Sequence, residues 1–274
     1  MKLPEVLFVK HCPQLAPERK VFLEKHLEER VPIKDIRWIE DYNYDHPFIE
    51  WLNVTQNLPY GVKLTSNLVK TLFTCKQMIE ENIEAAIFTD DDITFHHDWV
   101  KYFESIPDDI NKVGFVNLGT SYMYNKKPIM NNIYAIANNG GCECAWLSLN
   151  YVKGFMSNLN LGHGLDIIWH AYLCMNKLPL LYQPIAHQTS TLTNFTTLDK
   201  EQYNAPNWKE FIKGYNSLEK VDFDQLLTQY EEFKILKKKK EEKFFELFGK
   251  RVDIKNVHYV NSNTQDFKFD ILTY

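Results

Sequence analysis

Short apolar runs alternate with longer amphipathic stretches over the first two thirds of the chain. The short runs are rich in β-branched and aromatic residues, and we expect strands at 5–9, 36–39, 85–89, 113–118 and 178–182. The longer stretches repeat apolar residues at helical spacing, and we expect helices at 17–30, 65–82, 99–105, 150–159 and 167–175. This alternation predicts an α/β fold, a mostly parallel Rossmann-type sheet flanked by helices on both faces.

Local signals set several of the expected boundaries. Thr65 or Ser66 is the expected N-cap of the helix over 65–82. Two further apolar segments, 134–137 and 142–147, surround an Asn-Asn-Gly-Gly turn and predict a hairpin. The two glycines of that turn either shape the hairpin or let an acceptor approach the backbone closely.

The composition changes beyond about residue 200, so we divide the chain into a domain over 1–200 and a helical extension with a tail over 201–274. Residues 222–248 are rich in Glu and Lys with recurrent Phe and Leu, which predicts one long helix or a helical pair. The four lysines at 237–240 form either a solvated helix face or a basic surface for an acidic membrane or partner. The tail over 251–274 is a candidate edge strand.

Composition and charge exclude several classes of protein. With 274 residues, of which 45% are hydrophobic, the chain can bury a full core as one large α/β domain or two small ones. The net charge of −5 argues against a general nucleic-acid binder, which needs a basic face. The five scattered cysteines form no zinc pattern, and a reducing compartment is the simpler interpretation. Without a signal peptide or membrane-spanning pattern, we expect a cytoplasmic protein.

Three consecutive aspartates, Asp90, Asp91 and Asp92, follow the apolar run at 85–89 and form what we call the aspartate triplet. Adjacent carboxylates repel one another, so such a cluster at the end of a buried strand is costly unless a cation neutralises it. Oxygen ligands suit Mn²⁺ or Mg²⁺, which keep positions open for water and substrate phosphates. We therefore interpret the triplet as a metal site for a nucleotide diphosphate; the alternative is an acidic turn before the next helix.

The ordered set of features resembles nucleotide-sugar glycosyltransferases of the GT-A type, whose hallmark is an apolar strand that ends in Asp-x-Asp. More narrowly it resembles family twenty-five, of the lipopolysaccharide-biosynthesis and procollagen-galactosyltransferase type. The likeness spans roughly 5–190, and the features that carry it are Arg19 before a helix, Leu64-Thr65, the stretch 87–93 and the isolated Asp166. The chain departs from the family in having Asp90 for a glutamate and in lacking the family's acidic and histidine positions over 66–75.

The resemblance implies a metal-dependent, inverting transfer of a sugar from a UDP-sugar to a hydroxyl of a glycan, lipid-linked or protein acceptor. Asp92 is the expected direct ligand of the metal, and Asp90 binds it through water or holds the ribose. His187 completes the metal shell from across the site; the alternative is a packed or surface histidine. The expected donor-binding residues are Val9, Arg19, Lys63, Thr65 and Asp90.

Inversion needs a base that removes the proton of the attacking hydroxyl. Asp166 is the candidate base, with an ordinary N-cap of the following helix as the alternative. Asp91 is expected to orient the sugar, with a solvent-facing turn residue as the alternative. His96, His97 and Asp98 contain metal-ligating side chains, but adjacent histidines in a strand point to opposite faces, so we expect no joint ligation.

Two further functions agree with the sequence. A two-metal phosphoesterase or nuclease would need a second cluster of carboxylates or histidines close to the triplet. A non-catalytic binding protein would use the same scaffold, with the lysine-rich helix as a docking element. The intact triplet argues against a degenerate, non-catalytic scaffold.

Overall fold

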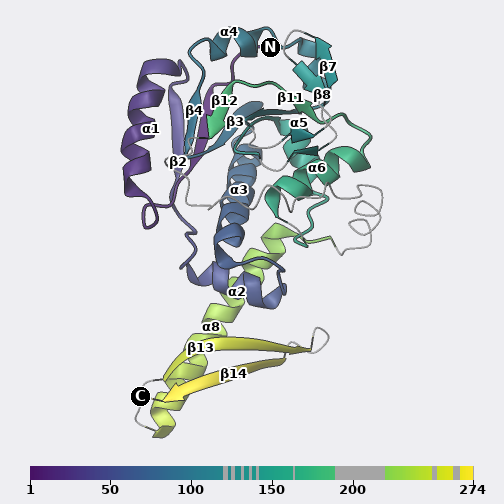
Figure 1. Ribbon diagram of the computed structural model, residues 1–274. Helices are drawn as coiled ribbons and strands as arrows, with labels where there is room; N and C mark the ends of the chain where they lie inside the picture. The colour runs from purple at the N-terminus through teal and green to yellow at the C-terminus, as the bar shows by residue number, and fades with distance from the viewer. Residues whose placement is uncertain are drawn as a thin grey trace.

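The computed structural model describes residues 1–119, 123–124, 127–130, 133–135, 138–139, 142–162, 164–188, 220–248, 252–261 and 266–273. A central eight-stranded sheet organises this part of the chain (Figure 1). Its strands, in spatial order, are β2 (Asp35–Ile39), β1 (Val6–Lys10), β3 (Ala85–Asp90), β10 (Cys144–Ser148), β5 (Phe115–Gly119), β11 (Leu181–Tyr182), β8 (Ile133–Ala135) and β7 (Lys127–Met130).

Most strands of this sheet point the same way, which confirms the predicted fold class. β2 and β3 both run parallel to β1, and β11 runs parallel to β5. β10 lies between β3 and β5 and runs antiparallel to both. The ends of β1 and β3 therefore meet at one edge of the sheet, where their connecting loops diverge.

Helices cover both faces of the sheet, because side chains of each strand alternate between two cores. In β1, Val6 and Phe8 join one core, while Leu7 and Val9 join the other. The first core packs against α2 (Pro47–Thr55), α3 (Val62–Glu80), α5 (Leu149–Met156) and α6 (Leu165–Met175). The second core packs against α1 (Pro17–Arg30) and α4 (Trp99–Glu104). A 3₁₀ turn, η1 (Asp108–Lys112), follows α4 in the chain. All but α2 and η1 match predicted helices.

The predicted N-cap of the helix over 65–82 and the alternative interpretation of Asp166 as an N-cap are both wrong. α3 begins at Val62 with Gly61 as its N-cap, so Thr65 lies inside the helix and its backbone N–H donates to Gly61 O at 3.2 Å. α6 begins at Leu165 with Gly164 as its N-cap, which makes Asp166 the second helical residue rather than the cap. Both helices start from an extended glycine, a position where Ser, Thr and Asp were expected on propensity alone.

The predicted hairpin around 138–141 is also wrong. β8 pairs with β11 and β7, whereas β10 pairs with β3 and β5, so the two segments occupy different places in the sheet. A short strand β9 (Asn138–Asn139) pairs instead with β6 (Met123–Tyr124). Gly140 and Gly141 lie outside the described residues. β10 lies inside the sheet between β3 and β5, with both faces of the sheet covered. Its apolar side chains are therefore more fully buried than they would be in a solvent-facing hairpin.

The remaining elements lie outside the central sheet. β4 (Ile93–Phe95) pairs antiparallel with β12 (Ala186–Gln188). α8 (Phe223–Phe248) confirms the predicted long helix, and Phe223 and Tyr230 bury its first turns against Phe48. Figure 1 shows α8 reaching away from the sheet, with β13 (Val252–Asn261) and β14 (Asp266–Thr273) beside its far end. β13 and β14 pair with each other, so the tail is not an edge strand of the central sheet. Within the described ranges, no helix combines the length and apolarity needed to cross a bilayer.

Candidate functional site

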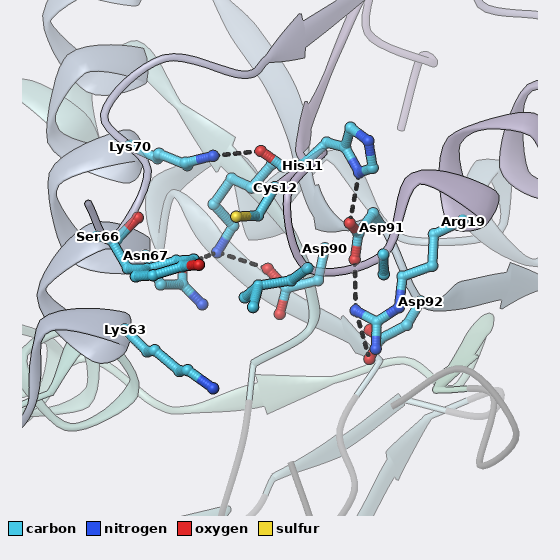
Figure 2. Close-up of a pocket in the computed structure, with 14 residues that line it drawn as sticks. His11, Cys12, Arg19, Lys63, Ser66, Asn67, Lys70, Asp90, Asp91 and Asp92 are labelled. Atoms are coloured by element: carbon cyan, nitrogen blue, oxygen red, sulfur yellow. Dashed lines mark hydrogen bonds and ion pairs between the residues drawn. The ribbon is translucent and has the colours of Figure 1, made fainter. Parts of the chain in front are cut away.

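A cavity opens where β1 and β3 end (Figure 2). After β1 the chain turns into α1 and then β2 on one side, whereas β3 lies on the other side of β1. In open α/β sheets such a divergence of loops at the carboxyl ends of strands is the usual place for a ligand. Residues after β1, one arginine of α1, one face of α3 and the aspartate triplet line the cavity.

One face of α3 supplies a polar wall. The wall consists of residues at positions i, i+3, i+4 and i+7 of the helix, which lie on one side of it: Lys63, Ser66, Asn67 and Lys70. Figure 2 shows the triplet between this wall and the arginine of α1. Asn67 Oδ1 accepts a hydrogen bond from Lys10 Nζ at 2.7 Å, which links the wall to the end of β1.

Asp91 is the most firmly held member of the triplet. Its Oδ2 lies 2.6 Å from His11 Nδ1, and its Oδ1 accepts from Arg19 Nη1 at 2.8 Å. Burial alone would raise the pKa of this carboxyl, but the hydrogen bond from His11 and the charge and hydrogen bond of Arg19 outweigh burial and lower the pKa. The ionised carboxylate can only accept, so His11 carries its proton on Nδ1.

The other two aspartates also face protein cations. Asp90 Oδ1 lies 2.8 Å from Lys10 Nζ, and Asp92 Oδ2 lies 3.5 Å from Arg19 Nη1. Asp92 is only 3% exposed, whereas the side chain of Asp90 is 25% exposed. Lys10 and Arg19 thus relieve the repulsion among the three carboxylates. The sequence analysis expected a metal ion alone to relieve it.

Arg19 has hydrogen-bonding capacity to spare. The residue is 6% exposed, and its Nε and Nη2 are buried with no hydrogen-bond partner among the described residues. An unmatched buried donor is costly, and on a guanidinium it suits a planar or tetrahedral anion. Lys63, exposed at the opposite wall, adds a further cation to the same cavity. The arrangement therefore favours an anionic ligand.

Lys70 connects the ends of β1 and β2 at the cavity. Its ammonium donates to the backbone carbonyl of His11, to Ile39 O at 3.3 Å and to Asn43 Oδ1 at 2.6 Å. Burial lowers the pKa of Lys70 to about 8, and the nearby Cys12 and Asp91 work in the opposite direction. Because the three acceptors lie at the end of β2 or in the loops after β1 and β2, Lys70 fixes both loops against α3.

The donor set of the triplet fits a hard divalent ion only in part. Both carboxylate oxygens of Asp91 are engaged by His11 and Arg19, so Asp91 is not a ligand. Asp90 and Asp92 offer oxygen atoms at the cavity wall, and Mg²⁺ or Mn²⁺ commonly binds to one or two carboxylates together with substrate phosphates. Two aspartates therefore suit the ion when a diphosphate supplies the remaining oxygens.

The structure brings together some of the predicted site residues. Arg19, Lys63 and Asp90 line the cavity with Asp91 and Asp92. Val9 and Thr65 do not.

The first of these two, Val9, is fully buried in the second core. Thr65 is fully buried within α3, and its hydroxyl accepts from Asn53 Nδ2 at 2.6 Å. Val9 packs in the core and Thr65 anchors α3, and neither side chain lines the cavity.

His187 and Asp166 remain predictions. His187 is exposed on β12, opposite Thr94, and among the described residues its ligand atoms form no close group of three with those of Asp90 and Asp92. The side chain of Asp166 lies outside the described residues.

Sequence reasoning missed Lys10, His11 and Lys70. A lysine and a histidine directly after the first strand, at the edge where the triplet was expected, gave a signal for the first two. Lys70 had no such signal, because a lysine on the polar face of a predicted helix is ordinarily a surface residue.

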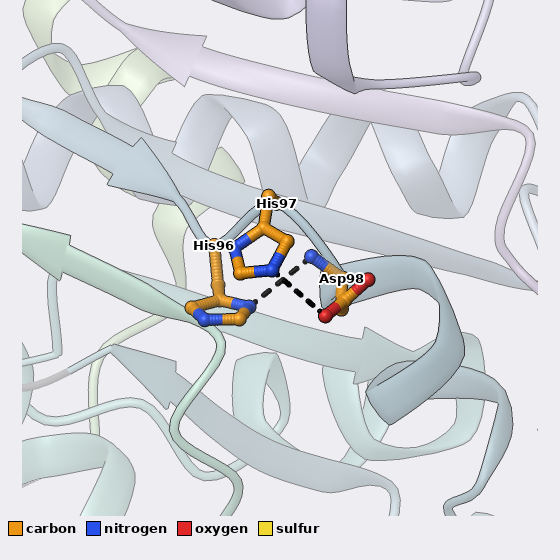
Figure 3. Close-up of side chains that lie close together, drawn as sticks. All are labelled: His96, His97 and Asp98. Atoms are coloured by element: carbon orange, nitrogen blue, oxygen red, sulfur yellow. Dashed lines mark hydrogen bonds and ion pairs between the residues drawn. The ribbon is translucent and has the colours of Figure 1, made fainter.

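His96, His97 and Asp98 gather elsewhere (Figure 3). They follow β4 rather than lying in it, so strand alternation does not separate them, and the expectation of opposite faces is wrong. None of the three lines the cavity, which weakens the two-metal alternative, because that chemistry needs ions about 4 Å apart.

No protein-family model matches the chain, and no curated protein matches it in sequence. Solved structures with partial likeness include an inositol-1-phosphate CTP transferase from T. maritima, at 9% identity over 79% of this chain and 98% of that one, with a TM-score of 0.43. A197 from STIV is 11% identical over 66% of this chain and 82% of that one, with a TM-score of 0.41. A glycosyltransferase involved in glycosylation of the major capsid of PBCV-1 is 8% identical over 63% of this chain and 67% of that one, with a TM-score of 0.28. These values are too low to bear on function, which rests on the cavity itself.

Proposed function

We propose that this protein is a glycosyltransferase that takes a sugar from a nucleotide diphosphate donor, a UDP-sugar, in the cavity at the ends of β1 and β3. The observation that carries the proposal is the buried edge of Arg19. Its Nε and Nη2 have no hydrogen-bond partner among the described residues, and the residue lines the same cavity as the aspartate triplet. A diphosphate supplies the anionic oxygens that this edge lacks.

The cations of the cavity have distinct roles in this proposal. Arg19 binds a phosphate through its unmatched edge while Asp91 and His11 hold its position. Lys63 approaches the diphosphate from α3 and stabilises the charge that grows on it as the sugar departs. Lys70 keeps the loop of His11 in place and does not touch the donor.

Asp90 and Asp92 are the residues that would hold Mn²⁺ or Mg²⁺ beside the donor. The ion, when bound, supplies Lewis-acid stabilisation of the leaving diphosphate. Asp92, the more deeply buried of the two, is the direct ligand, and Asp90 also holds the ribose of the donor. His187 is the proposed third ligand.

The acceptor is a hydroxyl of a glycan, a lipid-linked sugar or a protein. Asp166 is the proposed base that removes its proton, which gives transfer with inversion. Asp166 is the second residue of α6.

The proposal is tested by turnover of UDP-sugars and by UDP binding in Mn²⁺. Asp92→Ala should abolish both while circular dichroism shows a folded protein. Asp109→Ala is the matched control, since Asp109 is a fully exposed aspartate paired only with Lys112 in the described structure, and it should leave both intact. Full activity of Asp92→Ala would end the assignment.

The alternatives predict different results in the same assays. Release of phosphate from a simple ester, with no donor binding, would indicate a phosphoesterase. Donor binding without hydrolysis or transfer to any acceptor would indicate a binding protein on this scaffold.

A further inference from the structure

Among the described residues, a single group of three side chains has ligand atoms close enough to hold an ion together. One ligand atom from each of His96, His97 and Asp98 lies within 4.8 Å of the other two. His97 Nε2 is 2.9 Å from Asp98 Oδ2, and the two imidazole rings are 4.1 Å apart. Two ligands of one zinc ion lie about 3 to 4 Å apart, so small side-chain rotations close this group on an ion.

The backbone beneath the group is fixed. His96 N–H donates to Ile185 O at 2.9 Å, and Trp99 N–H donates to His96 O at 3.1 Å. Trp99 is fully buried, and its Nε1 donates to Arg30 O at 2.8 Å. The three ligands therefore rise from a rigid corner between β4 and α4, which lowers the entropy lost when an ion binds.

The protonation of His96 already suits a metal. Asp98 N–H donates to His96 Nδ1 at 3.1 Å, so Nδ1 carries a lone pair and the proton of the neutral ring is on Nε2. Figure 3 shows this nitrogen, His97 Nε2 and the Asp98 carboxylate turned toward one another. An ion bound there replaces the weak N–H contact and leaves His96 Nε2–H free to donate to water.

We propose that His96, His97 and Asp98 form a binding site for a transition-metal ion of the Zn²⁺ or Ni²⁺ type, separate from the donor cavity. Two imidazoles and one carboxylate are the ligands that Zn²⁺ and Ni²⁺ prefer, and Mg²⁺ does not use imidazole readily. With three protein ligands, the remaining positions are open to water or to a group from a partner. The bound ion links the end of β4 to the start of α4.

The test uses the untagged full chain, stripped of metal, titrated with NiCl₂ by calorimetry and heated with and without ZnCl₂. Wild type should bind one Ni²⁺ and melt at a higher temperature in Zn²⁺. His96→Ala and His97→Ala should each weaken Ni²⁺ binding at least tenfold and abolish the Zn²⁺-dependent shift.

His46→Gln is the matched control, because His46 is partly exposed at the start of α2 and should bind Ni²⁺ as wild type does. Asp92→Asn should also retain the Ni²⁺ site, so loss of donor binding and loss of this site are separable. Equal Ni²⁺ affinity in wild type and in the His96→Ala/His97→Ala double variant would overturn the proposal.

Discussion

Two aspartate-containing clusters flank the three-residue strand β4 and differ in almost every physical respect. The aspartate triplet precedes β4; its carboxylates face Lys10, Arg19 and His11. The cluster of His96, His97 and Asp98 follows β4 at the surface, where the Asp98 carboxylate lies beside the His97 ring. The same residue type thus pairs with buried cations in one place and lies beside an exposed imidazole in the other.

A run of acidic residues therefore does not by itself show where a metal binds. The triplet has the stronger sequence pattern, yet Asp91 is fully engaged by protein groups. The second cluster has a weak pattern, yet its ligand atoms already converge. Partners supplied by the fold decide which carboxylates remain available.

The largest expected effect comes from breaking the buried pair of the triplet. Arg19→Leu removes the guanidinium that faces the buried carboxylates of Asp91 and Asp92 and should lower the free energy of unfolding by about 3–5 kcal/mol. Arg37→Leu, which removes an arginine paired with the half-exposed Asp35 and Glu81, should cost about 1 kcal/mol or less. Urea denaturation of both variants makes the measurement, and equal losses would contradict the account.

Asp91→Asn should cost slightly less, about 2–3 kcal/mol at pH 7, because Asp92 still faces Arg19. The pKa of Asp91 is lowered in the folded state, so its ionisation stabilises the fold above the unfolded pKa near 4 and less as the pH falls below it. The difference between wild type and variant should therefore shrink as the pH falls from about 4 toward 2. A constant difference across that range would show that Asp91 does not act through its charge.

Lys70→Met should cost about 2 kcal/mol at pH 7, since three acceptors lose a charged donor. The folded pKa of Lys70, about 8, is below its ordinary value of about 10.5, so the unfolded chain binds more protons between these values. Wild type should thus gain stability relative to Lys70→Met as the pH rises from 8 to 10. Thermal unfolding across this range tests the sign, and a relative loss would contradict it.

His97→Ala should have the smallest effect on the metal-free protein, within about 0.5 kcal/mol, because the His97–Asp98 pair is exposed. A cost as large as that of Asp91→Asn would mean that the surface cluster is structural, and the contrast between the two clusters would fail.

The sequence predicts most elements of this fold but few of its tertiary contacts. The strands at 5–9 and 85–89 and the long helix over 222–248 follow from apolar periodicity, which is a local property. The position of β10 between β3 and β5 cannot be predicted from local sequence, because a strand buried on both faces is apolar throughout whether it runs parallel or antiparallel to its neighbours. The position of the cavity followed from the triplet at the end of a strand. The partners of Asp91, however, are 80 and 72 residues away in the chain, and no spacing rule connects them.

We propose above that the cavity at the ends of β1 and β3 holds the diphosphate of a nucleotide sugar. A crystal of the full chain soaked with UDP and MnCl₂ tests it most directly, with anomalous scattering to locate manganese. We expect the diphosphate against Arg19 and Lys63, with manganese beside Asp92. A cavity without UDP at saturating concentration, or UDP bound at another place in the molecule, would contradict the account.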